Sequence, residues 1–434
     1  MHKYCLGALA AAGLLMGGLT AGSASAADFG GNCCADLEER IAELEATTAR
    51  KGNRKVSLTI SGWVGQQVMW WDDGFEENVY VGDLGATLSS HFKMTGQATI
   101  SPGWYAGYVL HIEARNNNSL ALTQDASDIT FGEGVAVLQS FWFVKSDNLG
   151  KVSVGLQSQA SDNTAILVDG SGSLVPANWV AFDYNSFLLR ATDGSLAVGN
   201  GGAIPAATWG GIGGCLGGGA IGDCNGGTQN VVRYDSPTFA GFSVSASWGE
   251  DDMWDVAGRY AGEFGGFKVA AAAAYNELSD ESFGVPSGDT YEYFQAGLYI
   301  QHVPTGLFAY GAYGNAEFDV AAGDSDTYYV KGGLRERWTP LGHTVLYGEY
   351  EYNEASGAFV QDTSVGGGAP FAGVPTDSEF NMWGGGIVQE IDAAAMSVWL
   401  SYRHLEYEDN TPNGGAGVEY EDFQYIKAGA LINF

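Results

Sequence analysis

Residues 56–71, "VSLTISGWVGQQVMWW", alternate in side-chain character over most of their length. A period of two residues is that of a β-strand, whose successive side chains point to opposite faces. The even-numbered face holds Val56, Leu58, Ile60, Val64, Val68 and Trp70, and the odd-numbered face includes Ser57, Thr59, Ser61 and Gln67. The stretch therefore predicts a strand that lies between an apolar and a polar environment.

Similar alternation recurs along the rest of the chain. The further segments are roughly residues 90–100, 105–115, 136–145, 151–157, 230–235, 241–249, 254–261, 267–275, 291–302, 307–314, 326–338, 344–352, 380–390, 395–405 and 422–434. Together with the first they make sixteen predicted strands. The fold class that follows is all-β, with an even number of antiparallel strands.

The connections between these strands alternate in length. Short ones are "SPGW", "SDNLG", "DSPTFAG", "GEFGG", "HVPTG", "TPLG" and "IDAAA", most of them rich in the turn residues Gly, Pro and Asp. Long ones include residues 116–135, 276–290, 315–325, 353–379 and 406–421. An even number of strands with short turns at one end and long loops at the other is typical of an outer-membrane barrel.

Charged side chains show which face of the predicted barrel meets lipid. A basic residue at the bilayer midplane on the lipid face costs about 2 to 4 kcal/mol, so charges should point inward. Lys268 alternates with the apolar residues of "FKVAAAAAY", and Asp255 and Arg259 alternate with those of "WDVAGRY". We therefore predict a transmembrane barrel with a polar interior.

Composition agrees with this class and excludes others. Charged residues are only 16% of the chain, whereas about a quarter is usual for soluble proteins. The net charge of −32 argues against nucleic-acid binding, which needs basic patches. No cofactor is predicted, although acids in the long loops could hold Ca²⁺ or Mg²⁺ that bridges to lipopolysaccharide phosphates and could favour cations at the channel mouth.

The chain divides into three predicted regions. Residues 1–26 resemble a signal peptide, and residues 27–53 form a periplasmic helix with an apolar a/d stripe; residues 54–434 form the barrel. The helix could pair with copies of itself as a short coiled coil or pack on its own domain. Adjacent Cys33 and Cys34 are not expected to bond to each other because the closure is strained.

One connection, residues 158–229, is far longer than the others. It contains apolar clusters such as "NWVAF" and "SFLLR", which are too apolar for a solvated loop. We therefore predict that it folds inward as a constriction loop. Within it, Cys215 and Cys224 could close a disulfide, and the acids available to face basic wall residues are Asp162, Asp169, Asp183 and Asp193.

Several stretches make the chain similar to the general porins of alphaproteobacterial outer membranes. They are "DLEERIAELEATTARKGNRKVSLTISG", "SPGWYAGY" at 101–108, "LGKVSVG" at 149–155, "RYDSPTFAGFSVSASWGEDD" at 233–252 and the terminal Phe434. The resemblance implies homotrimers of sixteen-stranded barrels that pass small hydrophilic solutes by diffusion. It also implies a basic cluster on the wall opposite the constriction loop, at Lys93, Arg115, Arg233, Arg259, Arg335, Arg337 and Arg403.

The last strand is predicted to close the barrel. In "YIKAGALINF", Phe434 would have its backbone paired with the strand that begins near Lys55, while Lys427 and Asn433 would face water in the pore. The resemblance suggests that the barrel-assembly machinery recognises the terminal Phe434.

Three functions other than a general diffusion channel would each require different features of the sequence. An enzyme is not expected, because His91, His111, His302, His343 and His404 are scattered along the sequence without a catalytic motif. A substrate-specific channel, for a sugar or another small solute, would use inward aromatics such as Trp63 and Trp399. A purely structural barrel or adhesin would have a plugged lumen.

Overall fold

The computed structural model describes residues 55–127, 134–197, 207–212, 227–249, 252–279, 289–321, 323–360, 376–409 and 419–434. The predicted signal peptide, the periplasmic helix with Cys33 and Cys34, and the pair Cys215 and Cys224 lie outside these residues. Within them the longest helix is α2, the four-residue Trp209–Ile212. None of the helices in the described ranges is long and apolar enough to cross a membrane.

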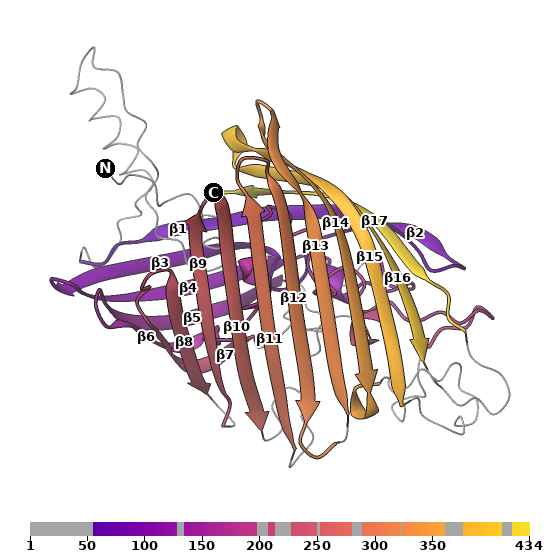
Figure 1. The fold of residues 1–434 in the computed structure, drawn as a ribbon, viewed down its shortest axis with the longest axis horizontal. Helices are drawn as coiled ribbons and strands as arrows, with labels where there is room; N and C mark the ends of the chain where they lie inside the picture. The colour runs from indigo at the N-terminus through magenta and orange to yellow at the C-terminus, as the bar shows by residue number, and fades with distance from the viewer. Residues whose placement is uncertain are drawn as a thin grey trace.

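Strands form nearly all of the described structure (Figure 1). Their bounds are β1 Thr59–Asp72, β2 Glu77–Gly82, β3 Ser90–Ser101, β4 Trp104–Arg115, β5 Gly134–Ser146, β6 Gly150–Ser158, β7 Thr228–Asp235, β8 Phe242–Gly249, β9 Trp254–Phe264, β10 Phe267–Ser279, β11 Thr290–His302, β12 Leu307–Phe318, β13 Asp324–Thr339, β14 Gly342–Ser356, β15 Asp377–Ile391, β16 Met396–Asp409 and β17 Phe423–Asn433.

The wall closes on itself. Each strand from β3 to β17 pairs antiparallel with the next, and β1 pairs with both β3 and β17. At the seam, the backbone N–H groups of Gly62 and Phe434 each donate to the other residue's carbonyl at 3.0 Å. The predicted sixteen-stranded barrel and its closing pair are confirmed, and closure leaves no open sheet edge in lipid.

One further strand, β2, was not predicted. The first part of β1 pairs with β3, and its last part, from Gln67 to Asp72, pairs with β2. Residues 83–89 leave the wall between these two strands, and Asp83 in that excursion accepts a hydrogen bond from the Gly85 N–H at 2.7 Å. A six-residue strand next to a cluster of acids gives too short an alternation to be recognised in sequence.

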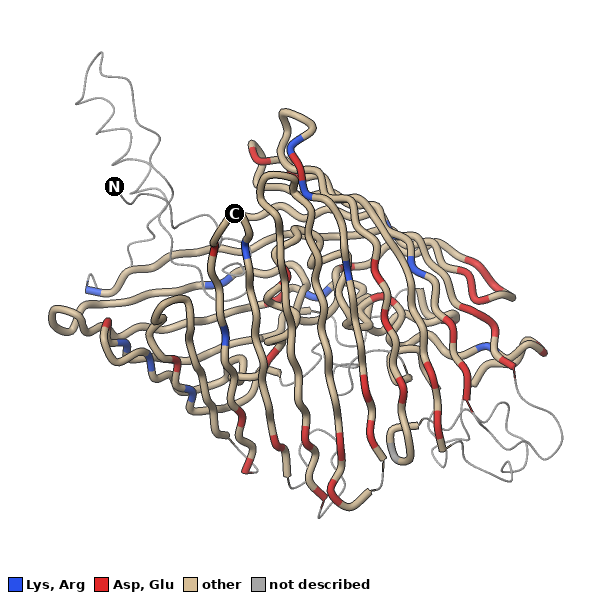
Figure 2. Tube along the Cα trace, viewed as in Figure 1, with Lys and Arg blue, Asp and Glu red and all other residues tan. Residues whose placement is uncertain are grey.

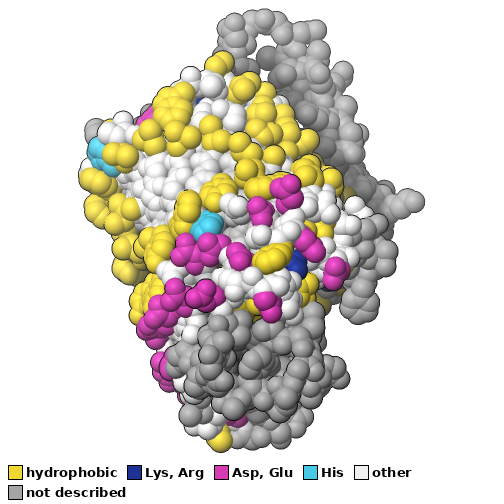
Figure 3. Space-filling model, turned by 90° about the vertical axis from the view of Figure 1, so that its right-hand side faces the viewer, with side chains coloured by type: hydrophobic (Ala, Val, Ile, Leu, Met, Phe, Trp, Pro, Cys, Tyr) yellow, Lys and Arg dark blue, Asp and Glu magenta, His cyan; other side chains and the backbone are white. Residues whose placement is uncertain are grey.

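The two faces of the wall differ as predicted. Along β1, Val64 and Val68 are 57% and 45% exposed on the outer face, whereas Gln67 and Met69 are 5% and 3% exposed on the inner face. Figure 3 shows apolar side chains spread over the outer surface beside a group of acids. Apolar residues outside and polar residues inside are the arrangement that lipid requires.

The strands extend further than predicted at the end that carries the long connections. For example, β10 runs to Ser279, β14 to Ser356 and β16 to Asp409. Acidic residues gather toward this end of the strands, whereas several Lys and Arg lie elsewhere in the barrel (Figure 2). The alternation ends in the sequence before the strands do, because acids replace the apolar residues there.

Candidate channel interior

Residues 159–197, here called the inner segment, are the longest described part of the connection between β6 and β7. Tyr184 and Phe187 in this segment have no exposed side-chain surface. The Phe187 ring lies 5.2 Å from that of Trp71 on β1 and 4.8 Å from that of Phe423 on β17. The segment is therefore packed against inward-facing residues of the wall.

The beginning of the inner segment is fixed by polar side chains of β9, β11 and β12. Ser161 donates hydrogen bonds from its backbone N–H and its hydroxyl to Asp255 at 2.6 and 2.7 Å. The N–H of Ala165 donates to Gln295 at 2.7 Å, and the Tyr310 hydroxyl donates to the Ala165 carbonyl at 2.9 Å. Wall side chains thus pair backbone groups that would otherwise be left unsatisfied inside the protein.

A buried ion pair joins the inner segment to β13. Lys331 Nζ lies 2.6 Å from Asp169 Oδ2, and neither side chain has exposed surface. The same ammonium donates to the Ala177 carbonyl at 2.7 Å and lies 5.8 and 5.7 Å from the ring centroids of Tyr310 and Tyr347. A charge in such dry surroundings is tolerated only while its partner is present.

Arg403 on β16 makes the second such connection. Its guanidinium pairs with Glu349 of β14 at 2.9 Å and donates to the Asn178 carbonyl of the inner segment at 2.6 Å. The Tyr329 hydroxyl also donates to Glu349. Arg403 therefore holds the inner segment while its charge is neutralised by the wall.

The third connection comes from β17. Lys427 forms an ion pair with Asp183 of the inner segment, and Gln67 of β1 donates to the same carboxylate at 2.5 Å. Lys427 points inward as predicted, but it is only 3% exposed and does not face open water. The inner segment covers it.

The inner segment also contributes a base of its own, which was not predicted. Arg190 pairs with Asp73 at 2.7 Å and with Glu76 at 3.2 Å, both between β1 and β2. Arg190 is the last residue of "SFLLR", whose apolar residues predicted that this connection folds inward. The usual polarity, an acidic segment against a basic wall, is reversed at this end.

The lumen also contains a cavity of about 420 Å³, lined by the inner segment and by strands around the wall. Its lining includes Trp63, Lys93, Asp162, Arg233 and Arg335. Within the described residues, Lys93 makes no ion pair, whereas Arg233 pairs with Asp235 and Arg335 pairs with Glu390, both at 2.7 Å. Charged side chains therefore border open space in the lumen.

Asp162 has a distinct electrostatic environment on the cavity side. The pKa of its carboxyl is raised to about 6: burial and the nearby Asp255 raise the pKa, while the hydrogen bond with Ser158 and the charges of Arg233 and Arg259 lower it. Desolvation outweighs the attraction of the two bases because it disfavours the charged form directly.

The predicted basic wall residues have four different settings. Arg403, Arg233 and Arg259 contact the inner segment or Ser158 beside it, and Lys93 and Arg335 line the cavity. Arg115 pairs with Glu113 at 3.1 Å. Arg337 differs from the rest: it is about half exposed and pairs with Asp392 of the short β15–β16 turn at 2.6 Å.

The predicted loop acids also divide. Asp169 and Asp183 pair with wall lysines, and Asp162 lines the cavity. Asp193 does not face a wall base: it is exposed, and it accepts hydrogen bonds from the backbone and hydroxyl of Ser195. An Asp two residues before a Ser in a turn is commonly satisfied locally.

Lys331 was missed, although the sequence contained a signal for it. It shares the odd-numbered face of β13 with Arg335 and Arg337, both of which were predicted. The same parity rule would have included it.

Two histidines that are distant in sequence come together beside a glutamate, and a third histidine lies beside two acids. Two groups in the described residues have their ligand atoms within 4.8 Å of one another: His91, His111 and Glu113, and His404, Glu406 and Asp422. The arrangement offers metal ligands, and neither group contains a nucleophilic Ser or Cys of the kind used in acyl transfer.

The barrel is similar to several solved structures. The anion-selective porin from Comamonas acidovorans has a TM-score of 0.54 at 14% identity, covering 87% of this chain and 100% of that chain. OmpT of Vibrio cholerae, in its in-vitro folded trimer form, has 0.51 at 15% identity, with 87% and 99% covered. Salmonella typhi OmpF in complex with daunomycin has 0.50 at 13% identity, with 89% and 100% covered. At these identities the likeness shows the fold alone.

Sequence comparison extends the likeness from fold to family. No curated protein matches the chain. The family described as Gram-negative porin, however, matches residues 8–410, which is most of the chain. With the closed barrel and its polar interior, this match identifies the chain as a member of the Gram-negative porin family, an outer-membrane channel protein of bacteria.

Proposed function

We propose that the protein is a general diffusion porin that passes small hydrophilic solutes and ions passively and favours cations. The observation that carries the proposal is the pairing of the deepest wall bases. Lys331, Arg403 and Lys427 are each neutralised by a carboxylate. These bases are therefore not available as a row of free positive charges that would attract anions.

The distribution of acids supports the same preference. Acids gather at the end of the barrel that carries the long connections (Figure 2). They include Glu277, Asp289, Glu317, Asp319, Asp324, Asp326, Glu354, Glu379, Glu408 and Asp409. Rings of carboxylates at a channel mouth raise the local concentration of cations.

Positive charge that would oppose this preference borders the cavity. Lys93 is the lining base without an ion pair among the described residues, since Arg233 and Arg335 are paired. Fields are screened over about 8 Å at physiological ionic strength, so a single ammonium acts on only one part of the passage. The similarity to an anion-selective porin does not decide selectivity, which depends on charge placement rather than on the fold.

The test is conductance of the purified protein in planar bilayers. We expect ohmic steps, a reversal potential in a potassium chloride gradient that shows potassium favoured over chloride, and no block by sugars. Clear anion selectivity would contradict the cation preference, and absence of conductance would contradict the channel and favour a structural barrel.

A substrate-specific channel is the second candidate, and Trp63 is the observation that favours it. Trp63 lines the cavity, with its indole N–H donated to the Leu88 carbonyl at 3.0 Å. Trp399, also inward, is buried beside Gly429. One aromatic ring is a shorter track than a sugar channel needs. Block of the conductance by one class of solute, relieved by Trp63→Ala, would nevertheless favour this alternative.

We also propose the assembly and partners that the family resemblance implies. The chain would form a homotrimer, and Vibrio cholerae OmpT, to which the barrel is similar, has a trimer form. Loop acids would bridge to lipopolysaccharide through Ca²⁺ or Mg²⁺, and the barrel-assembly machinery would recognise Phe434. Membership of the alphaproteobacterial subgroup belongs to the same proposal.

A further inference from the structure

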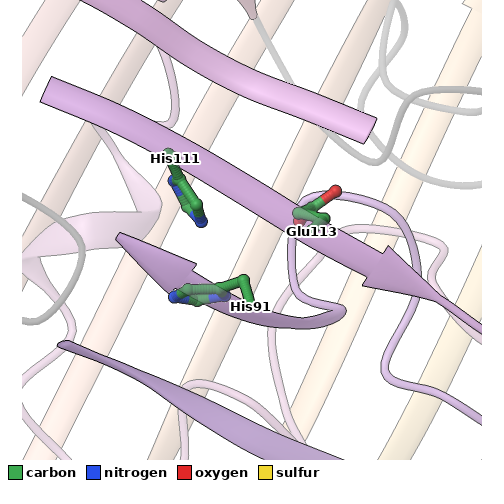
Figure 4. Close-up of side chains that lie close together, drawn as sticks. All are labelled: His91, His111 and Glu113. Carbon is green, nitrogen blue, oxygen red and sulfur yellow. The ribbon is translucent and has the colours of Figure 1, made fainter. Parts of the chain in front are cut away.

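Three potential metal ligands meet on the inner face of two neighbouring strands. His91 of β3 lies opposite Glu113 of β4 in register, and His111 is two residues before Glu113. All three are at least nine-tenths buried, with 8%, 6% and 0% exposed surface. Figure 4 shows the two imidazoles near one another between the strands, and their ring centroids are 4.2 Å apart.

The His91 ring is oriented by its own backbone. Its Nδ1 lies 3.0 Å from the Ser89 carbonyl oxygen, which can only accept a hydrogen bond. In the neutral ring Nδ1 therefore carries the proton, and the lone pair is on Nε2. A histidine that donates one N–H to a carbonyl while its other nitrogen is free has the usual arrangement of a metal ligand.

His111 and Glu113 have unsatisfied atoms at the same place. Neither ring nitrogen of His111 has a hydrogen-bond partner among the described residues, and both are buried. Glu113 uses only Oε2, which accepts from Arg115 at 3.1 Å and from the Thr87 N–H at 3.3 Å, and its buried Oε1 is unpartnered. A buried polar atom left without a hydrogen-bond partner is unfavourable, so a ligand that satisfied these atoms together would bind favourably.

The donor set selects the class of ligand. Two imidazoles and one carboxylate suit zinc and similar divalent transition metals, whereas Ca²⁺ and Mg²⁺ prefer oxygen ligands only. The three ligand atoms lie within 4.8 Å of one another. Ligands of one tetrahedral zinc are about 3 to 3.5 Å apart, given zinc–ligand bonds of about 2 Å, so binding would draw them slightly together.

The site is reachable from the lumen. His91 and His111 both line the cavity of about 420 Å³, beside Trp63. An ion could enter from this space, and water there could occupy a remaining coordination position.

We propose that His91, His111 and Glu113 bind one divalent transition-metal ion, with zinc as its natural probe. Lys93, opposite His111 in register, is the cation that would oppose it. Arg115 is already neutralised by Glu113 Oε2, which leaves Oε1 for the metal.

The other cluster provides a matched control. His404 Nε2 lies 3.2 Å from Glu406 and 3.3 Å from Asp422. Both carboxylates are about half exposed, and the histidine already has ion-pair partners. His404→Gln therefore removes an imidazole that also lies beside carboxylates but does not touch the proposed site.

The test uses the purified full chain, treated with EDTA and dialysed, and titrated calorimetrically with zinc chloride. We expect one zinc per chain, at least tenfold weaker binding in His91→Gln, His111→Gln and Glu113→Gln, and unchanged binding in His404→Gln. Lys93→Gln should tighten binding because it removes a repelling charge. Failure to bind zinc, or loss of binding in His404→Gln instead, would overturn the proposal.

A spectroscopic measurement guards against variants that fail to fold. The native protein loaded with Co²⁺ should show visible absorption of a four- or five-coordinate site with nitrogen ligands, and zinc should displace it. Equal binding of Mg²⁺, or a cobalt spectrum of a purely aqueous ion, would show that the imidazoles do not ligate the metal and would overturn the proposal.

Discussion

Inward-facing bases have different roles in two parts of the lumen. One is the wall on which the inner segment is packed, here called the packed side, and the other is the cavity, here called the open side. On the side formed by β13, β14, β16 and β17, Lys331, Arg403 and Lys427 are at most 3% exposed and each is paired with a carboxylate. At the cavity, whose lining comes from the inner segment and from strands around the wall that include β3, β7, β13 and β17, Lys93 has no ion pair among the described residues. An inward-facing base of this barrel thus fixes the inner segment, faces the passage or, like Arg233, does both, and strand parity alone does not distinguish these roles.

The largest expected effect follows from breaking the packed side. Lys331→Met leaves Asp169 as a buried charge without its partner, which should reduce the free energy of unfolding by about 3 to 5 kcal/mol. The double variant Lys331→Met with Asp169→Leu should recover most of this loss, because an apolar pair of similar volume avoids the desolvation cost. Guanidinium-induced unfolding in detergent, followed by tryptophan fluorescence, measures both.

Lys93→Met is the matched control on the open side. Since Lys93 borders the cavity and has no ion pair among the described residues, its loss should change the free energy of unfolding by about 0.5 kcal/mol or less. Equal losses in Lys331→Met and Lys93→Met would show that the two sides do not differ in the way described.

The sequence predicted well which side chains of a strand point inward, but it predicted poorly which side chains contact one another. Alternation alone placed Asp255 and Arg403 inside, and it predicted the pairing of Phe434 with the first strand. Which face of a strand points inward can be read from that strand alone, and a charged side chain that faced lipid would be unfavourable. The fold could therefore be predicted from one chain.

Contacts across strands depend on register, which periodicity does not determine. His91 and His111 are twenty positions apart in sequence and meet only because β3 and β4 pair as they do. Arg190 meets Asp73 only through the path of the inner segment. Neither contact leaves a local pattern, so the candidate metal site and the reversed ion pair could not be predicted.

A smaller effect is expected from pH on the open side. Because the pKa of Asp162 is raised to about 6, this carboxyl is ionised at pH 8 and mostly neutral at pH 5. The preference for potassium over chloride should fall between these values, by between about twofold and fivefold, since a unit charge in water about 4 Å from a passing ion contributes about 1 kcal/mol or less. Reversal potentials measured across this range test it.

The titration of Asp162 also makes the stability of the folded protein depend on pH. A carboxyl whose folded-state pKa is raised binds its proton more readily in the folded protein, so stability is present at low pH and is lost as pH rises through about 6. Asp162→Asn should remove this component of both profiles. An unchanged pH dependence of selectivity in that variant would assign the effect to other carboxyls.

The smallest effect is expected at Asp193, the predicted constriction acid that lies outside both arrangements. Its exposed carboxylate accepts hydrogen bonds only from Ser195 among the described residues, so Asp193→Ala removes a local turn contact and no contact with the wall. Unfolding free energy should change by about 0.5 kcal/mol or less, and ion selectivity should match that of the unmodified protein. A selectivity change comparable to that of Asp162→Asn would mean that Asp193 reaches the passage in the membrane, and the division between packed and open sides would then have to include the outer turn of the inner segment.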